Sequence, residues 1–477
     1  MRLAVKKIVA LHPRATGAGR QQLRWVHTYG AALASSFFVI VAVQLIVEHS
    51  NVLLTIEKYF KLDYDHLRAF SLAPAFVVYF FLIREVLQRK VVTDVALRTI
   101  IKYFFLFGGL FLLVTPGPGS DFYHYLFEDR ALVVHQQNPF FVPPNQLPAE
   151  PSGWLAAWRH VPAQHGPMRN IVMVPAAVIG QSSLVLHIYL ANLTIFIFLL
   201  GSVVLVHRLA LHINPATAPA AVMLYGWNPL LLHETLHGGG AEVTMIFWAL
   251  LSLQLLFYKR WFLAVAMLTF SVLVKYATLF LPPLFALYAF FQVRQPSRRA
   301  LLFFGGALIL SAITVVIFMP FWQGPGTLQG TLYNGLFFNY NSFPAMIAAF
   351  FSFINPAVDR YLFKYLAAAA FFVIYGYLVV RIVQRRSMTF LRLIETSAIV
   401  MLLLLLLLRT FFNVKYIILA LPFVILSGPQ WHLFTAFITG LYVAEPFYFE
   451  TFAWQFLPSV VLFSSIPVID KFLLQKK

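Results

Sequence analysis

The residue best placed to do chemistry is Asp121, which follows the apolar run ending in Thr115-Pro-Gly-Pro-Gly-Ser120. One interpretation makes Ser120 the N-cap of a new helix and Asp121 an acid in its first turn, where the helix dipole favours negative charge. The other makes Asp121 a general base, because an ionised carboxylate can remove a proton within hydrogen-bond reach. The local pattern leaves both interpretations open.

A series of polar residues follows Asp121. Taken singly, the charged residues and histidines of this series are typical of a solvated loop face. Taken in order, they form a pattern whose meaning depends on the whole set. The series comprises Tyr123, Glu128, Asp129, Arg130, His135, Asn138-Pro139-Phe140 and His165-Gly166-Pro167.

A second polar cluster surrounds three consecutive glycines between two apolar runs. Glycines let the backbone approach a ligand closely, and acids at membrane depth need partners or a function. These side chains either satisfy one another at a helix break or contact a ligand. A metal site is conceivable, although the spacing matches no defined ligand motif. The cluster contains Asn228-Pro229-Leu230, His233, Glu234, His237, Gly238 to Gly240 and Glu242.

Three cations form the third feature. Lys275 interrupts an apolar stretch that continues to Pro282-Pro283, and Arg409 and Lys415 flank two later apolar runs. Cations near helix ends commonly extend toward the membrane surface. A bound anion such as a lipid phosphate explains the same positions, since phosphate accepts hydrogen bonds from Lys and Arg. The two explanations are of equal weight on the residues alone.

The elements that position these residues are predicted to be membrane-spanning helices. Of 477 residues, 60% are apolar and 11% are charged, against about 25% charge in a soluble domain. The apolar runs approach the length that crosses a hydrocarbon core of about 30 Å. We expect an all-α, multi-pass protein with about 14 spans in a single transmembrane domain. The predicted spans are 29–48, 70–88, 101–116, 184–206, 216–233, 241–257, 261–275, 277–293, 300–319, 361–380, 391–408, 415–428, 431–447 and 453–470.

Charge predicts the orientation of these spans. Residues 1–28 form a basic segment that we place in the cytoplasm, followed by an uncleaved first helix, and most basic residues then fall on the cytoplasmic side. Most acids fall on the opposite side, together with two long loops, 117–183 and 320–360, in which 169–180 and 344–354 are expected to be interfacial helices. We therefore expect cytoplasmic termini and an extracytoplasmic site. The lack of a retention or sorting signal favours a prokaryotic plasma membrane.

Several classes of function are excluded or disfavoured. The chain has no cysteine, which excludes disulfides, thiolate nucleophiles and iron–sulfur clusters. The formal charge of +18 orients the spans, so we expect no nucleic-acid partner. A transporter or flippase for lipid-linked sugars remains an alternative, although we see no internal repeat and the suspected residues gather toward one face. A scaffold of an envelope complex would leave Asp121 and the glycine break without a role.

In order, these motifs resemble the GT-C superfamily of multi-spanning glycosyltransferases, in particular the family 87-like branch that uses polyprenyl-phosphate mannose. In that branch an early Asp is followed by a Tyr, an Asn-Pro-Phe-like triplet, a Gly-Pro turn, an Asn-Pro-Leu stretch with downstream acids, and a Val-Lys-Tyr segment. The residues here that match are Asp121, Tyr123, Asn138-Pro139-Phe140, His165-Gly166-Pro167, Asn228-Pro229-Leu230, Glu234, Glu242, Val274-Lys275-Tyr276, Leu281-Pro282-Pro283-Leu284 and Asn341-Ser342-Phe343-Pro344.

The resemblance implies a role for each residue. Asp121 would be the base of an inverting displacement that transfers a hexose, mannose above all, from a polyprenyl-phosphate donor to a lipid-linked or envelope glycan. The expected partners are thus the lipid bilayer, the donor and this acceptor, with no cofactor and no metal. The residues expected to bind sugar or acceptor are Tyr123, Asn138, His165, Glu234 and Glu242, and those expected to bind the donor phosphate are Lys275, Arg409 and Lys415.

Overall fold

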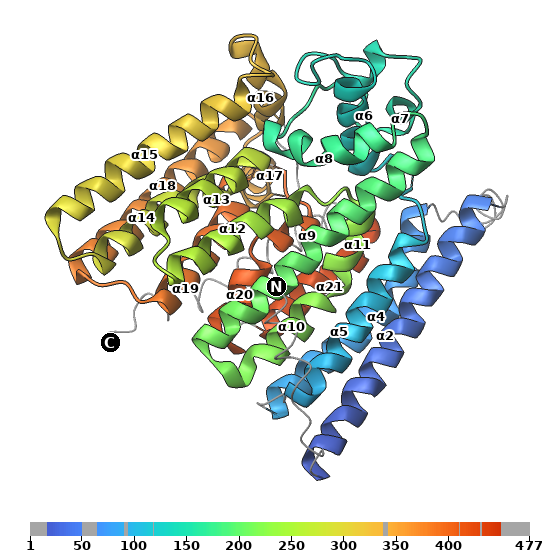
Figure 1. Cartoon of the computed structure of the whole chain (residues 1–477). Helices are drawn as coiled ribbons and strands as arrows, with labels where there is room; N and C mark the ends of the chain where they lie inside the picture. Colours follow the sequence, from blue (N-terminus) through green and yellow to red (C-terminus); the bar gives the residue numbers. More distant parts are fainter. Residues whose placement is uncertain are drawn as a thin grey trace.

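The computed structural model describes residues 17–49, 64–89, 94–117, 119–336, 342–409, 411–429 and 432–449, and within these ranges the chain is helical without any strand (Figure 1). This confirms the all-α prediction. Three long helices begin the described chain: α2 (Gly17–His49), α4 (Tyr64–Arg89) and α5 (Asp94–Leu112). Helix α2 packs on both α4 and α5, and α21 (His432–Phe449) packs on α4.

The predicted first long loop folds into a small helical lobe at one end of the molecule (Figure 1). Its apolar helix α8 covers the stretch 169–180 expected to form a short helix, and its interfacial position stays a prediction. Helix α6 begins at Asp121 after Ser120, whose backbone is extended and whose hydroxyl makes no capping hydrogen bond. The elements of this lobe are α6 (Asp121–Val133), η1 (Pro144–Gln146), α7 (Pro151–Leu155) and α8 (Pro167–Ile179).

The predicted span at 216–233 is wrong, because two short helices replace it. Helix α10 ends at Gly226, and α11 starts at Pro229, whose ring nitrogen has no hydrogen to continue the helical pattern. A second break follows at Gly238 to Gly240, where α11 and α12 meet at 114°. These elements are α9 (Leu184–Ile213), η2 (Pro215–Thr217), α10 (Ala218–Gly226), α11 (Pro229–His237) and α12 (Ala241–Phe257).

The middle of the chain forms an outer layer of helices beside α12 (Figure 1). Gly306 is the one buried residue of helix α15, whose other residues are exposed or half-buried. Helix α17 covers the second stretch expected to form a short helix, at 344–354, and its interfacial position stays a prediction. The elements are α13 (Trp261–Val274), η3 (Tyr276–Phe280), α14 (Leu281–Gln292), α15 (Pro296–Phe318), η4 (Pro325–Leu328), α16 (Gln329–Leu336), α17 (Phe343–Ile354) and α18 (Arg360–Arg385).

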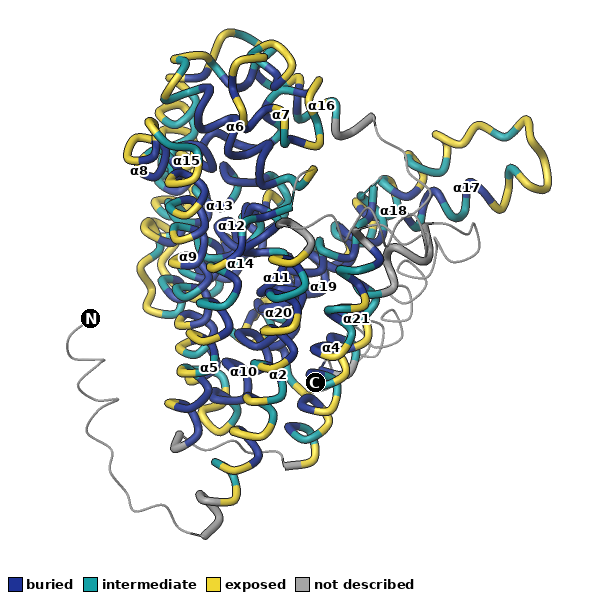
Figure 2. Tube along the Cα trace, turned by 90° about the vertical axis from the view of Figure 1, so that its right-hand side faces the viewer, coloured by how far each residue is buried: buried dark blue, intermediate teal, exposed yellow. Residues whose placement is uncertain are grey.

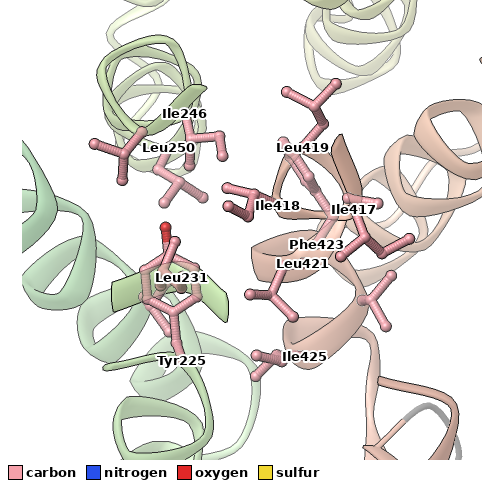
Figure 3. Close-up of a cluster of buried hydrophobic side chains, with 14 of the residues drawn as sticks. Tyr225, Leu231, Ile246, Leu250, Ile417, Ile418, Leu419, Leu421, Phe423 and Ile425 are labelled. Atoms are coloured by element: carbon pink, nitrogen blue, oxygen red, sulfur yellow. The ribbon is translucent and has the colours of Figure 1, made fainter. Parts of the chain in front are cut away.

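The chain then returns to the centre of the molecule. Helix α19 (Phe390–Leu403) continues into the π-helical turn η5 (Leu404–Leu408), which is followed by the 3-10 turn η6 (Val414–Leu419) and by α20 (Leu421–Ser427). Figure 3 shows Ile418 of η6 pointing toward Ile246 and Leu250 of α12 within a buried apolar cluster. Apolar packing therefore holds η6 against α12, and this positions Lys415.

Buried residues fill the centre of the bundle (Figure 2). By length and composition, six helices of the described chain can cross a membrane, or seven if the bent pair of α11 and α12 counts as one span. The expected number of about 14 is not confirmed, because many of the predicted runs fold as shorter or broken helices. The six are 21–46, 66–88, 184–213, 296–318, 360–385 and 390–408. The predicted span at 453–470 lies outside the described residues.

Candidate active site

Asp121 lies at the N-terminus of α6 and forms an ion pair across the molecule. Lys415 Nζ, from η6, donates a hydrogen bond to Asp121 Oδ2 over 2.7 Å, and Trp158 Nε1 donates to Oδ1 over 3.1 Å. Both members of the pair remain partly accessible, with 24% of the Asp121 side chain and 21% of the Lys415 side chain exposed. An approaching substrate can therefore reach both groups.

The electrostatic environment keeps Asp121 ionised. Burial opposes its ionisation, but the Lys415 ammonium, with help from Lys275 and the Trp158 hydrogen bond, outweighs burial and holds the Asp121 pKa well below its usual range. A carboxylate that stays ionised has the protonation state that a general base requires. Its basicity is low, however, for as long as Lys415 stays bound to it.

A second ion pair joins Lys275 to Glu242. Lys275 follows the last residue of α13, and its Nζ donates to Glu242 Oε1 in the first turn of α12. Both side chains are largely buried. The mutual-satisfaction interpretation of the two glutamates is therefore wrong for Glu242, which is paired with a cation on another helix.

Tyr416 connects the cations of the site. The Arg409 guanidinium lies 4.1 Å from the Tyr416 ring centroid, and Lys275 Nζ lies 5.2 Å from it. The π-helical turn that ends at Leu408 interrupts helical geometry just before Arg409. Within the described residues, Arg409 Nε has no hydrogen-bond partner. A buried donor without a partner is available to an anionic ligand.

His165 lies beside the end of α13, close to Lys275, and contacts Tyr125 of α6. Burial first, and then the Lys275 charge, lower the His165 pKa to about 4, so the ring is neutral near pH 7. A hydrogen bond of 2.6 Å joins the Tyr125 hydroxyl to His165 Nε2. The neighbouring Gly166 lies so close to the end of α13 that a Cβ atom would be 1.9 Å from Leu273 O. Only glycine allows this turn to brace the end of α13.

Three residues expected to bind substrate have protein partners. The Tyr123 hydroxyl donates to Pro116 O over 2.8 Å, and Asn138 Nδ2 donates to Phe321 O over 2.8 Å. Glu234 accepts a hydrogen bond from Tyr442 and lies 3.9 Å from His233 Nδ1. These contacts support structural roles, and binding of substrate by the three residues stays a prediction.

The charged residues downstream of Asp121 do not form a solvated loop face; this prediction is wrong. Glu128 and Asp129 are buried on α6, where Arg169 of α8 donates two hydrogen bonds to Asp129 over 2.7 and 2.9 Å and one to Glu128 over 3.1 Å. A sequence does not show which partners a charge will meet after folding. Here the pairing fastens α8 to the helix that begins with Asp121.

Arg130, from the same helix, binds the loop between η1 and α7. Its Nε donates to Glu150 Oε1 over 2.7 Å, while His135 Nε2 lies 2.8 Å from Glu150 Oε2. Glu150 is buried, and its pKa is lowered because these hydrogen bonds, with two from Ser152, outweigh the effect of burial. The loop that carries Trp158 is thereby tied to α6.

Across the described part of the chain, no three His, Asp or Glu residues gather as metal ligands would. His233 and His237 pack with their rings 5.0 Å apart, and both are buried. The hypothesis of a metal site at the glycine break thus has no geometric support among these residues.

The comparison with family models adds the decisive observation. Residues 27–291, more than half of the chain, match the family described as "Alpha-(1->6)-mannopyranosyltransferase, N-terminal domain". The chain belongs to this mannosyltransferase family. It is therefore a glycosyltransferase, as expected from the resemblance to the GT-C superfamily, while the narrower family 87-like assignment stays a prediction. No curated protein and no solved structure matches the chain.

The matched region of this mannosyltransferase holds Asp121, Glu242 and Lys275, whereas Arg409 and Lys415 lie beyond it. Both parts of the chain thus contribute to the site. Sequence reasoning missed Trp158 and Tyr416. Tyr416 adjoins Lys415 and could have been suspected from that position, but nothing in the sequence distinguishes Trp158 from the other tryptophans.

Proposed function

We propose that this mannosyltransferase transfers its sugar from a polyprenyl-phosphate donor to a lipid-linked or envelope glycan on the extracytoplasmic face, by one inverting displacement. The acceptor hydroxyl attacks the anomeric carbon, the bond from that carbon to the phosphate oxygen breaks, and the acceptor proton passes to Asp121. The family membership supports mannosyl transfer. The donor, the acceptor and the face of the membrane belong to the proposal.

The cations beside Asp121 have the chemistry that the leaving group needs. Negative charge grows on the phosphate as its bond to the sugar breaks, and preformed cations stabilise that charge. Lys415, Lys275 and Arg409 would surround the phosphate, each bound at present to a carboxylate or an aromatic ring. Because the protein supplies these cations, the scheme requires no metal and no cofactor.

The ion pair between Asp121 and Lys415 is the observation that carries the proposal. A donor phosphate that attracts Lys415 would weaken its hold on the carboxylate and raise the Asp121 pKa. The base would thereby gain strength only when the donor is bound. This coupling would limit proton transfer in the absence of donor and place the base beside the leaving group.

The alternative of a transporter or flippase is less well supported. The partly accessible pair of Asp121 and Lys415 begins at the helical lobe, and the family that the chain matches performs sugar transfer. A transport pathway is expected to place its ionisable groups between repeats near the membrane midplane.

The test is to incubate the purified protein with a panel of radiolabelled polyprenyl-phosphate sugars and to identify the labelled product. We expect label transfer from polyprenyl-phosphate mannose. Asp121→Asn should lower turnover by about 10²- to 10⁴-fold, the usual contribution of a general base, while the protein stays folded.

Asp359→Asn is the matched control, because Asp359 caps α18 through its side chain and Asn can make the same hydrogen bond. It should retain full activity. Transfer from a nucleotide sugar but from no polyprenyl-phosphate sugar would reject the donor. Normal turnover by Asp121→Asn would remove Asp121 from the mechanism.

A further inference from the structure

A cavity of about 510 Å³ lies between α13, α14 and α15, away from the candidate active site. Its wall includes Trp261, Phe285 and Phe303, and all but a few of its lining residues are apolar. The protein's own side chains leave this space unfilled, and its apolar wall favours an apolar occupant. Its volume is in the range, roughly 300 to 1,000 Å³, that holds ligand-sized molecules.

The cavity lies toward the end of the bundle opposite Asp121. Helix α13 starts at Trp261, which lines the cavity, and ends just before Lys275, which lies in the site. At 1.5 Å per residue, its 14 residues separate these ends by about 21 Å. Phe290, near the end of α14, and Arg299, in the first turn of α15, also line the cavity at this far end.

The polar groups of the wall are already bonded within the protein, but the Arg299 charge is not balanced by a carboxylate. Ser252 Oγ donates to Ala264 O over 2.7 Å, and Thr269 Oγ1 donates to Val265 O over 2.8 Å. Arg299 donates through Nε to Val293 O and lies 4.3 Å from the Phe290 ring centroid. Among the described residues, no carboxylate forms a salt bridge with Arg299.

Positive charge concentrates at this end of the cavity. Arg294, Arg298 and Arg299 fall within six consecutive residues at the start of α15, and the first two are exposed. An apolar space with arginines at one end is complementary to an amphiphile with an anionic headgroup. Basic pockets between transmembrane helices bind such headgroups in other membrane proteins.

We infer that this cavity binds an anionic glycerophospholipid from the membrane leaflet farther from Asp121, with an acyl chain between α13 and α15 and the headgroup phosphate at Arg299. The lipid would fill the space between α13 and α15 that the side chains of these helices leave open. This lipid site is separate from the proposed donor site, because Arg299 and Lys275 lie toward opposite ends of α13.

The test measures binding of dioleoylphosphatidylglycerol and dioleoylphosphatidylcholine to the delipidated full-length protein, by native mass spectrometry and by the shift in unfolding temperature. We expect the anionic lipid to bind more tightly. Arg299→Gln should weaken its binding by roughly fivefold, a typical contribution of one arginine at a membrane surface, while leaving the zwitterionic lipid unaffected.

Ala307→Trp should block the cavity, because Ala307 lines it from α15. Leu308→Trp is the matched control: Leu308 is 70% exposed on the same helix and does not line the cavity. Equal binding of both lipids, or wild-type binding by Ala307→Trp, would overturn the inference. So would an increase in the KM for polyprenyl-phosphate mannose in Ala307→Trp with unchanged binding of dioleoylphosphatidylglycerol, since the cavity would then hold the donor tail.

Discussion

Lys415 contacts Asp121 in the absence of donor, although the proposed mechanism needs it at the phosphate. An isolated cation at this depth would lose hydration without compensation, and an isolated carboxylate likewise. The ion pair between Lys415 and Asp121 compensates both groups for their lost hydration while no donor is bound. In the proposed mechanism, the same pairing makes the Asp121 pKa depend on whether a phosphate is bound at Lys415.

Replacing Lys415 by Met should reveal this coupling. Loss of one group that stabilises the leaving phosphate should lower kcat by about 10²- to 10³-fold. In the wild type the Asp121 pKa lies well below its usual range, so this residue should cause no fall in kcat/KM until strongly acidic pH. Lys415→Met should shift that acidic fall to higher pH. A pH profile of the residual activity identical to that of the wild type would exclude the coupling.

Asp129 should make stability depend on pH. Burial, with the negative charge of Glu128, outweighs Arg169 and raises the Asp129 pKa to about 7. A raised pKa means that the folded protein binds the Asp129 proton more tightly than the unfolded chain does. The resulting contribution to the free energy of unfolding is complete below about pH 4 and is lost as pH rises to about 7. Asp129→Asn should remove this pH dependence, which amounts to at most about 4 kcal/mol of the free energy of unfolding. Thermal unfolding of both proteins across this range provides the measurement, and parallel curves would contradict it.

The helices of the site are positioned by tight turns. The turn at His165 and Gly166 rests on the end of α13, and the glycine break between α11 and α12 rests on α6. The buried Arg169 network then fastens α8 to α6. Lys275 and Glu242 therefore lie at helix ends that close turns position against neighbouring helices.

Gly239→Ala tests the second of these turns. Gly239 has φ +96°, and a Cβ atom there would lie 2.4 Å from the Tyr125 ring. The strain alone costs about 1 to 3 kcal/mol, so the unfolding temperature should fall and Glu242 should shift. Gly109→Ala is the control, because it lies within α5 with open space around it and should stabilise by about 0.5 to 1 kcal/mol. Equal unfolding temperatures for the two variants would refute this role of the turn.

The whole molecule brings together segments that are distant in sequence. The lobe of α6, α7 and α8 supplies Asp121 and Trp158, the ends of α12 and α13 supply Glu242 and Lys275, and η6 supplies Lys415. The apolar cluster in Figure 3 holds η6 in place. The proposed mechanism therefore uses residues of both the matched region and the part of the chain that follows it.

The orientation in the membrane can be tested directly because the chain has no cysteine. Gln137→Cys places a thiol at an exposed position in the lobe, and Ser297→Cys places one at the opposite end, at the start of α15. A maleimide that cannot cross membranes should label Gln137→Cys in intact cells and Ser297→Cys only after permeabilisation. The reverse pattern would place the site in the cytoplasm.

Local sequence predicted the parts that depend on local physics. Apolar length predicted helices and membrane spans, and the positions of Asp121, Lys275 and Lys415 marked charges at helix ends. The prediction of a single span at 216–233 is wrong. Hydropathy indicates a continuous apolar run there, but Pro229 lacks the hydrogen-bond donor that a continuous helix needs. The predicted number of spans is not confirmed for a related reason. Hydropathy does not distinguish a spanning helix from a shorter apolar helix that is buried among others.

The sequence by itself determined that the chain is helical, enters a membrane and carries the ordered motifs of a glycosyltransferase, because composition, helix-breaking residues and motif order are local properties. Only the tertiary structure decided which charges meet. It paired Lys415 with Asp121 and Lys275 with Glu242, and it buried Glu128 and Asp129 against Arg169. The physical reason is that the strength of an ion pair depends on distance and burial, and both arise only when helices from distant parts of the chain pack together.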